Sequence, residues 1–320
     1  MTLGIIGFVL SLGLSFFAYP RFIELLHNSD LKQQVSEYAL DEFKDKKQTP
    51  TFGGLIFVLI PIVVSLVLNG IKFSQDLLML IFVFASFALV GLVDDYKIVK
   101  EGKNDGISPA VKMGSQLVLA LVFYFIYRYY GGNTIVSVPF IKDGIDIGFF
   151  YIPFVMLMLS GSSNAVNLTD GMDGLAGGTT LIALIPFVWI ALQAGRLDIL
   201  MFIMCVIGGL AGFLIYNHKP AQIFMGDVGS LALGALLASI SILLSKELLL
   251  VVIGFVFVFE TVTVIMQRIS WKVRKKRIFR YTPIHYSFTL AGWKEQDVVN
   301  FFYIMGVIVM VIGLALNAWV

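Results

Sequence analysis

The chain has 320 residues, of which 58% are hydrophobic and only 14% are charged, and its mean hydropathy is +0.89. A typical soluble domain carries about 25% charged residues. This composition excludes a pair of soluble domains, a disordered chain and a nucleic-acid-binding protein, and it indicates that lipid surrounds most of the chain. The one cysteine, Cys205, excludes an internal disulfide.

Ten segments are apolar and long enough to be membrane helices, which need about 20 residues. They cover residues 3–19, 51–69, 77–94, 111–130, 150–166, 175–193, 198–216, 229–245, 248–267 and 298–319. The connections between them are short. We therefore expect an all-α polytopic membrane protein with a single integral membrane catalytic domain over residues 1–320.

The basic residues predict the orientation of these ten spans. Eighteen of the 23 Lys and Arg residues fall in or beside the connections that follow the odd-numbered spans. Positively charged loops stay in the cytoplasm, so both termini are expected outside. One outer connection, near 134–148, alternates apolar and polar residues around Lys142-Asp143-Gly144, which predicts a small outer β-hairpin.

Two adjacent carboxylates, Asp94 and Asp95, end the third span. They repel each other, so a metal ion or a lysine is expected nearby, and Lys97 can share the helical face of Asp94. Neighbouring residues on a helix diverge by about 100°, and only one of the two carboxylates is therefore expected to face a ligand. A solvated helix end is the alternative.

The fifth connection, from Asn164 to Gly178, contains no basic residue. Asn167, Asp170 and Asp173 recur every three residues there and would line one side of a helical segment, and the glycines allow a ligand or a helix to approach closely. A glycine-rich helix contact with capping residues is the alternative. Two carboxylates and an amide in register favour a functional site.

Asp227, which lies between glycines just before the eighth span, is either a helix N-cap or a metal ligand. Carboxylates combined with amide oxygens favour Mg²⁺, and no Cys/His cluster suggests zinc. Lysines of the first inner loop and a very basic last inner loop, residues 271–285, could contact anionic groups. Together these features predict phosphoryl transfer involving a lipid phosphate at the inner membrane surface.

Five motifs occur in the order and loops of the polyprenyl-phosphate N-acetylhexosamine-1-phosphate transferases, which the chain resembles over essentially its whole length. They are Thr49-Pro-Thr-Phe-Gly-Gly, Asp94-Asp-Tyr-Lys97, Asn167-Leu-Thr-Asp-Gly-Met-Asp-Gly-Leu-Ala176, Phe224-Met-Gly-Asp-Val-Gly-Ser-Leu231 and Pro283-Ile-His285. Gly292-Trp293-x-Glu295 is similar to the muramoyl branch of that family.

The resemblance implies a multi-pass enzyme of the bacterial cell membrane with its active site on the cytoplasmic face. It would transfer phospho-N-acetylmuramoyl-pentapeptide from UDP-MurNAc-pentapeptide to undecaprenyl phosphate with Mg²⁺, giving lipid I and UMP in peptidoglycan synthesis. The resemblance also suggests a homodimer. A polyprenyl-phosphate GlcNAc-1-phosphate transferase is the alternative within the family. A proton-coupled transporter and a non-catalytic lipid-binding scaffold are more distant alternatives.

On this basis we expect Asp227 to bind Mg²⁺ and Lys97 to contact phosphate. Asp94 would position the lipid phosphate or act as its base, Asp95 would support the site, and a covalent route through a carboxylate is an alternative. The residues expected to contact substrate are Lys46, Lys47, Thr51, Asn167, Asp170, Gly171, Met172, Asp173, Asn217, Phe224, Gln267 and His285.

The histidine motif departs from the family pattern. Three consecutive histidines usually follow Pro-Ile in the muramoyl-type members, whereas Tyr286 and Ser287 follow His285 here. Any essential imidazole function would therefore depend on His285 alone.

Overall fold

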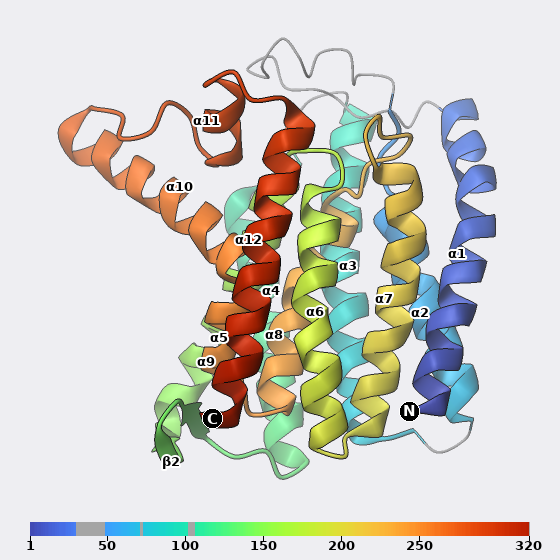
Figure 1. Cartoon of the computed structure of the whole chain (residues 1–320), viewed down its shortest axis with the longest axis vertical. Coiled ribbons are helices and arrows are strands. Elements are labelled where there is room, and N and C mark those ends of the chain that lie inside the picture. Colours follow the sequence, from blue (N-terminus) through green and yellow to red (C-terminus); the bar gives the residue numbers. More distant parts are fainter. Residues whose placement is uncertain (30–48, 71–72, 102–105, 320) are drawn as a thin grey trace.

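The computed structural model describes residues 1–29, 49–70, 73–101 and 106–319. The described chain is a bundle of long helices with one small β-ribbon (Figure 1). Its longer helices are α1 (Thr2–Asn28), α2 (Gly54–Asn69), α3 (Gln75–Glu101), α4 (Pro109–Tyr129), α5 (Tyr151–Thr169), α6 (Leu175–Gln193), α7 (Leu197–Asn217), α8 (Asp227–Leu243), α10 (Phe255–Arg274) and α12 (Glu295–Leu316). The shorter elements are β1 (Ile135–Val138), β2 (Ile141–Asp146), η2 (Gly148–Phe150), α9 (Glu247–Ile253), α11 (His285–Thr289) and η3 (Asn317–Trp319).

The helices have the lengths and compositions of membrane spans. Within the described ranges, seven helices are long and apolar enough to cross a membrane, or eight if the bent pair α9–α10 is one span. Large apolar side chains such as Phe17, Val67 and Leu157 are exposed on the outside of the bundle. An apolar surface of this extent is unfavourable in water but favourable in contact with lipid. The chain is therefore an all-α polytopic membrane protein.

Helix α8 lies at the centre of this bundle. Every residue from Val228 to Leu243 is buried, which fits a helix that is apolar on all sides. It packs against α3 and α5. The N-terminus of α8 is therefore enclosed by protein, and its first backbone N–H groups need partners from neighbouring helices.

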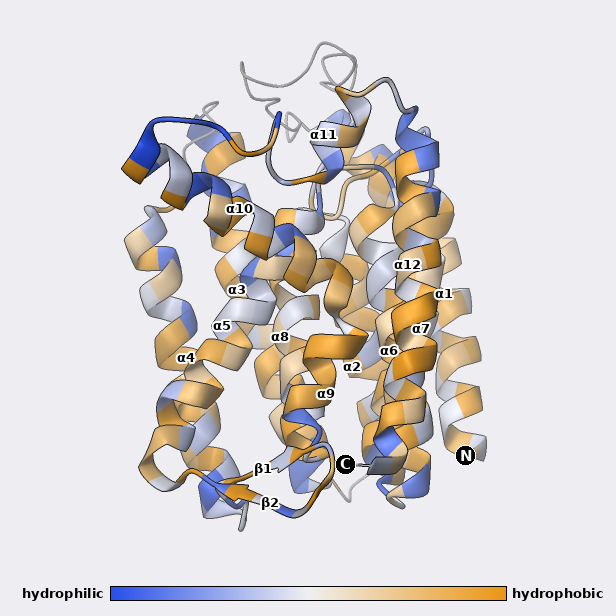
Figure 2. Ribbon diagram, turned by 60° about the vertical axis from the view of Figure 1, so that its left-hand side comes forward, coloured by the Kyte–Doolittle hydropathy of each residue, from blue (hydrophilic) through white to orange (hydrophobic). Residues whose placement is uncertain are grey.

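The prediction of one continuous helix over 248–267 is wrong. The segment is divided into α9 and α10, which meet at Gly254 with a bend of 82°. Counting apolar residues cannot detect this bend. α10 extends away from the bundle, and hydrophilic residues gather at its outer end (Figure 2). That end carries Lys272 and Arg274 in its last turn.

A two-stranded antiparallel ribbon occupies the predicted hairpin segment. Ile135 pairs with Asp146 and Val138 with Ile141, with an irregularity between Val136 and Val138. The ribbon lies at the same end of the bundle as the two chain termini, whereas α11 lies at the opposite end (Figure 1). This arrangement separates the ribbon from the end where the polar motifs meet.

Candidate functional site

The site is centred on the N-terminus of α8, and Asp95 of α3 caps that terminus. One oxygen of Asp95, Oδ1, accepts the backbone N–H of Asp227 at 3.1 Å, and Oδ2 accepts that of Val228 at 3.0 Å. The preceding Gly226 has φ +74°, and a side chain there would collide with Asp95. A charged cap at a buried helix N-terminus is favourable because it satisfies orphan donors and complements the helix dipole. Asp95 thus fixes the start of α8.

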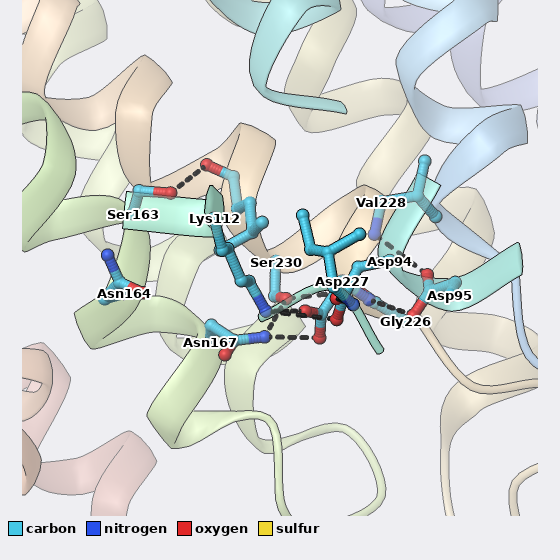
Figure 3. A network of polar contacts seen from close by, with 12 residues as sticks. Asp94, Asp95, Lys112, Ser163, Asn164, Asn167, Gly226, Asp227, Val228 and Ser230 are labelled. Atoms are coloured by element: carbon cyan, nitrogen blue, oxygen red, sulfur yellow. Dashed lines mark hydrogen bonds and ion pairs between the residues drawn. The ribbon is translucent and has the colours of Figure 1, made fainter. Parts of the chain in front are cut away.

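The carboxylate of Asp227 faces away from its own helix toward two other helices (Figure 3). Its Oδ2 contacts the ammonium of Lys112 in the first turns of α4, and its Oδ1 accepts the Nδ2 amide of Asn167 at 2.7 Å. Asn167 also donates to the hydroxyl of Ser230 at 2.9 Å. Asp227 is therefore held in place on both oxygens.

Lys112 joins Asp227 to the first carboxylate of the adjacent pair. Its Nζ lies 3.3 Å from Asp94 Oδ2, while Asp94 Oδ1 accepts the backbone N–H of Ile107 at 2.7 Å. Asp94 and Asp227 therefore share one ammonium group. The two neighbours Asp94 and Asp95 point to different partners, as helical geometry predicts: one faces Lys112 and the other caps α8.

The donor set fits Mg²⁺. The carboxylates around Lys112 are those of Asp94 and Asp227, which share its single ammonium group, and a third carboxylate, Asp95, caps the adjacent helix start. Within the described ranges, no group of three or more His, Cys, Asp or Glu side chains is arranged to hold a metal ion. Magnesium in phosphate-transfer sites usually takes one or two carboxylates together with water and substrate phosphates. Asp94 and Asp227 match that pattern.

The turn between α5 and α6 carries the next carboxylates. Burial, followed by the charges of Asp227 and Asp173, raises the pKa of Asp170 to about 7. Asp173 accepts the backbone N–H of Ala221 at 3.1 Å, and its own N–H donates to Glu295 at 3.1 Å. The negative charge of Asp227 therefore acts on Asp170, whereas Asp173 connects the turn to other loops through hydrogen bonds.

The side chains of Asn217 and Met172 contact the surrounding protein. The side chain of Asn217 accepts the N–H of Gly174 at 2.9 Å and donates to the carbonyl of Ile223 at 2.9 Å, which joins two loops of the site. Met172 is buried in an apolar cluster with Leu175 and other residues of the last helices. Neither side chain faces the carboxylates around Lys112.

The segment before α2 is paired with the segment before α8. Gly53 donates its N–H to Phe224 O at 2.8 Å, and Phe224 donates its N–H to Pro50 O at 2.9 Å. Thr51 is buried beside Gly226. The Phe224 ring is half-buried. This pairing places two of the predicted substrate residues, Thr51 and Phe224, next to the start of α8.

The C-terminal motif forms a third group of buried polar contacts. His285 Nδ1 lies 3.1 Å from Oε1 of Glu260, and both side chains are fully buried. The hydroxyl of Tyr286 donates to Gly171 O at 3.1 Å. Gln267 makes three hydrogen bonds to the backbone of residues 278–279. Gln267 therefore folds the basic loop back onto α10.

In the part of the chain that the structure describes, none of the three lysines predicted to contact substrate is found among the carboxylates around Lys112. Lys97 pairs with Glu101 at 3.9 Å, and both side chains are more than 40% exposed. Lys46 and Lys47 lie outside the described residues. The roles assigned to these lysines stay predictions.

Three residues that contact the site were not predicted from the sequence. Lys112 is one of the eighteen basic residues in or beside the connections after the odd-numbered spans, Glu260 lies inside the predicted span 248–267, and Glu295 belongs to the Gly292-Trp293-x-Glu295 motif. The partners of these residues lie far away along the chain, so the local sequence does not reveal which groups they contact. Their signal is the pairing of each with a carboxylate, an imidazole or a backbone N–H of the site.

Comparisons with known proteins show which family the chain resembles. A family model described as glycosyl transferase family 4 matches residues 77–245. The phospho-N-acetylmuramoyl-pentapeptide-transferase of Anoxybacillus flavithermus is 39% identical over 98% of this chain and 97% of the relative. The proteins of the same name from Halalkalibacterium halodurans and Bacillus subtilis are 41% and 40% identical, over 99% and 98% of this chain and 97% of each relative. These similarities span all the segments that build the site.

Proposed function

Because the chain belongs to the phospho-N-acetylmuramoyl-pentapeptide transferases, we propose that its reaction takes place around Lys112, where Asp94 and Asp227 share one ammonium group. The protein is a phosphotransferase of peptidoglycan synthesis. Its donor would be UDP-MurNAc-pentapeptide and its acceptor undecaprenyl phosphate, with lipid I and UMP as products. The observation that carries the assignment is the Lys112 ammonium, held between two carboxylates at a buried helix start.

The main barrier to this reaction is the approach of two anions. A phosphate monoester has its second pKa near ~6, so the acceptor phosphate is already largely ionised at neutral pH. A positive charge fixed in the site lowers the barrier more than a base would. Lys112 would supply one positive charge, and a Mg²⁺ ion held by Asp94 and Asp227 would offset the two carboxylates.

Asp94 suits a positioning role in this arrangement. Both of its oxygens are engaged, one by the N–H of Ile107 and the other by Lys112. A carboxylate that orients the lysine helps to place the phosphate, and it has no proton to remove from an ionised acceptor.

Asp227 and Asp94 would hold Mg²⁺, which when bound neutralises the diphosphate and orients it. Asn167 keeps Asp227 in a fixed rotamer through the 2.7 Å hydrogen bond. The Phe224 ring offers a stacking surface for uracil beside the same helix start. Lys97, and Lys46 and Lys47 from the first inner loop, would add positive charge toward the nucleotide.

The orientation of the chain in the membrane supports an inner-face site. The basic residues of 272–280 lie toward the end of the bundle opposite the two termini (Figures 1 and 2), and positive residues favour the cytoplasm. Asp94 lies near the end of α3 and Asp227 at the start of α8, while Lys112 lies near the start of α4 and Asn167 near the end of α5. These four helix ends point the same way. We therefore assign the site to the cytoplasmic face.

The test measures UMP release by the purified protein with undecaprenyl phosphate and either UDP-MurNAc-pentapeptide or UDP-GlcNAc. We expect release with the first donor alone, and at least about a hundredfold loss in Lys112→Met, the usual effect of removing one electrostatic group. Lys100→Met is the matched control, because Lys100 lies over the Tyr96 ring, 5.8 Å from its centroid. Preference for UDP-GlcNAc would instead favour a GlcNAc-1-phosphate transferase.

A further inference from the structure

A buried glutamate of α10 has no part in the reaction as described so far. Glu260 is fully buried, and both of its oxygens are used by one short segment. Oε2 accepts the backbone N–H of Ile284 at 2.8 Å, and Oε1 lies 3.1 Å from Nδ1 of His285. An ionisable residue inside an apolar helix is costly, so its retention with such defined partners points to a function in the site.

The carboxylate determines how the imidazole is protonated. An ionised Glu260 can only accept a hydrogen bond, and an imidazole that faces it presents Nδ1–H. The other ring nitrogen, Nε2, then points the opposite way. It is buried and has no hydrogen-bond partner among the described residues.

The nitrogen Nε2 faces the turn between α5 and α6. A side chain at Gly171 would collide with Nε2 of His285 and would meet the hydroxyl of Tyr286. The same hydroxyl donates to Gly171 O at 3.1 Å, and the His285 and Tyr286 rings pack with centroids 4.2 Å apart. Two side chains from α11 therefore contact the same glycine.

Gly171 is connected to the carboxylates around Lys112 through very few bonds. Its neighbour Asp170 donates its backbone N–H to Asn167 O at 3.2 Å, and the Asn167 side chain holds Asp227 at 2.7 Å. Moving Gly171 would therefore move Asn167, and with it the carboxylate of Asp227.

We propose that Glu260 is a positioning residue for the transfer reaction: it orients His285 so that Nε2 faces Gly171, and this contact sets the turn that carries Asp170 and Asn167. The proposal rests on the function proposed above. In this arrangement Nε2 faces the backbone of the Asp170–Asp173 turn at Gly171.

The test replaces Glu260 with glutamine, which keeps the volume but offers one acceptor and one donor. The glutamine oxygen can satisfy the N–H of Ile284, and its NH₂ then faces Nδ1. We expect the imidazole proton to move from Nδ1 to Nε2, and kcat to fall at least about tenfold, as for the loss of a charge-assisted hydrogen bond. KM for each substrate should change less than kcat.

The chain offers a direct spectroscopic readout. It contains only three histidines, His27, His218 and His285, so ¹⁵N labelling of histidine gives three sets of imidazole signals, and His285→Ala assigns one of them. The proton position on His285 can then be read in the wild type and in Glu260→Gln. A purely structural role for Glu260 would not change it in this manner.

The matched control is Glu247→Gln. Glu247 is also buried, accepts the hydroxyl of Tyr151 at 2.7 Å, and lies on α9, next to α10 in the chain. It lies away from the carboxylates around Lys112, so this variant should keep the wild-type kcat. Glu260→Asp serves if the glutamine variant does not fold, because it keeps the charge and should retain Nδ1–H with an intermediate kcat.

A double mutant decides whether Glu260 acts through His285. If it does, Glu260→Gln with His285→Ala should have the kcat of His285→Ala alone. Wild-type kcat in Glu260→Gln, multiplicative effects in the double mutant, or an unchanged imidazole proton would each overturn the proposal. A wild-type enzyme that releases no UMP would refute the proposed function, while the proton position would still test the Glu260–His285 geometry.

Discussion

Asparagine substitution of the two adjacent carboxylates should give different results. In Asp95→Asn one of the two acceptors for the N–H groups of Asp227 and Val228 becomes an NH₂ donor, which faces another donor. A hydrogen bond to a charged group contributes about 1.5–3 kcal/mol. We therefore expect a loss of stability of this size and a melting temperature lower by roughly 2–4 °C. Asp94 accepts one backbone N–H, from Ile107, and one bond from Lys112. An asparagine oxygen can keep the first, so Asp94→Asn should lower the melting temperature less than Asp95→Asn does and should lose turnover.

The assay follows thermal unfolding of the detergent-solubilised variants and, in parallel, UMP release at saturating substrate. Activity lost in Asp95→Asn should recover in part at low temperature, where the start of α8 is folded, whereas activity lost in Asp94→Asn should not. If Asp94 acted as a base for the acceptor phosphate, its variant would recover steeply with rising pH as that phosphate ionises. A lower melting temperature in Asp94→Asn together with an unaffected Asp95→Asn would refute the division of roles.

Further outcomes test the other parts of the site. Asp227→Ala should abolish turnover without unfolding the protein, and chelation of divalent cations should do the same reversibly, as measured by UMP release before and after adding Mg²⁺. Lys112→Arg should retain more activity than Lys112→Met, since it keeps the charge between the carboxylates, and equal losses would contradict an electrostatic role. His285→Ala should lose most activity, whereas Ser287→His should mainly lower the melting temperature, because the Ser287 hydroxyl bonds both the N–H and the C=O of Tyr281, at 2.9 and 2.6 Å.

The class of the fold and the position of most helices followed from composition alone. Lipid as solvent requires about 20 apolar residues per span, and that requirement leaves a strong signal in the sequence. The bend at Gly254 left no such signal, because α9 and α10 are both apolar at their junction and one glycine is common inside membrane helices. Whether a helix leaves the bundle depends on its packing neighbours, which lie elsewhere in the chain.

The candidate site was predicted where its residues form local motifs and missed where they do not. Asp94, Asp95 and Asp227 were identified because carboxylates at membrane boundaries are costly and therefore informative. Lys112 was not, because a lysine at a cytoplasmic helix start is already explained by membrane orientation. The lysine chosen from spacing, Lys97, shares the helix of Asp94, but its amine pairs with another residue of α3 at the surface.

The adjacent positions of Asp94 and Asp95 in the sequence can be explained by the different partners of the two side chains. Helix α8 is buried from Val228 to Leu243, so the backbone N–H groups at its start need an acceptor from another helix. Asp95 meets that need. Its neighbour on α3 then necessarily lies beside the same helix start but points about 100° away, where Lys112 and Asp227 meet. One residue of the pair therefore secures the folded position of Asp227, and the other shares its lysine, which ties the stability of the α3–α8 contact to the geometry of the reaction.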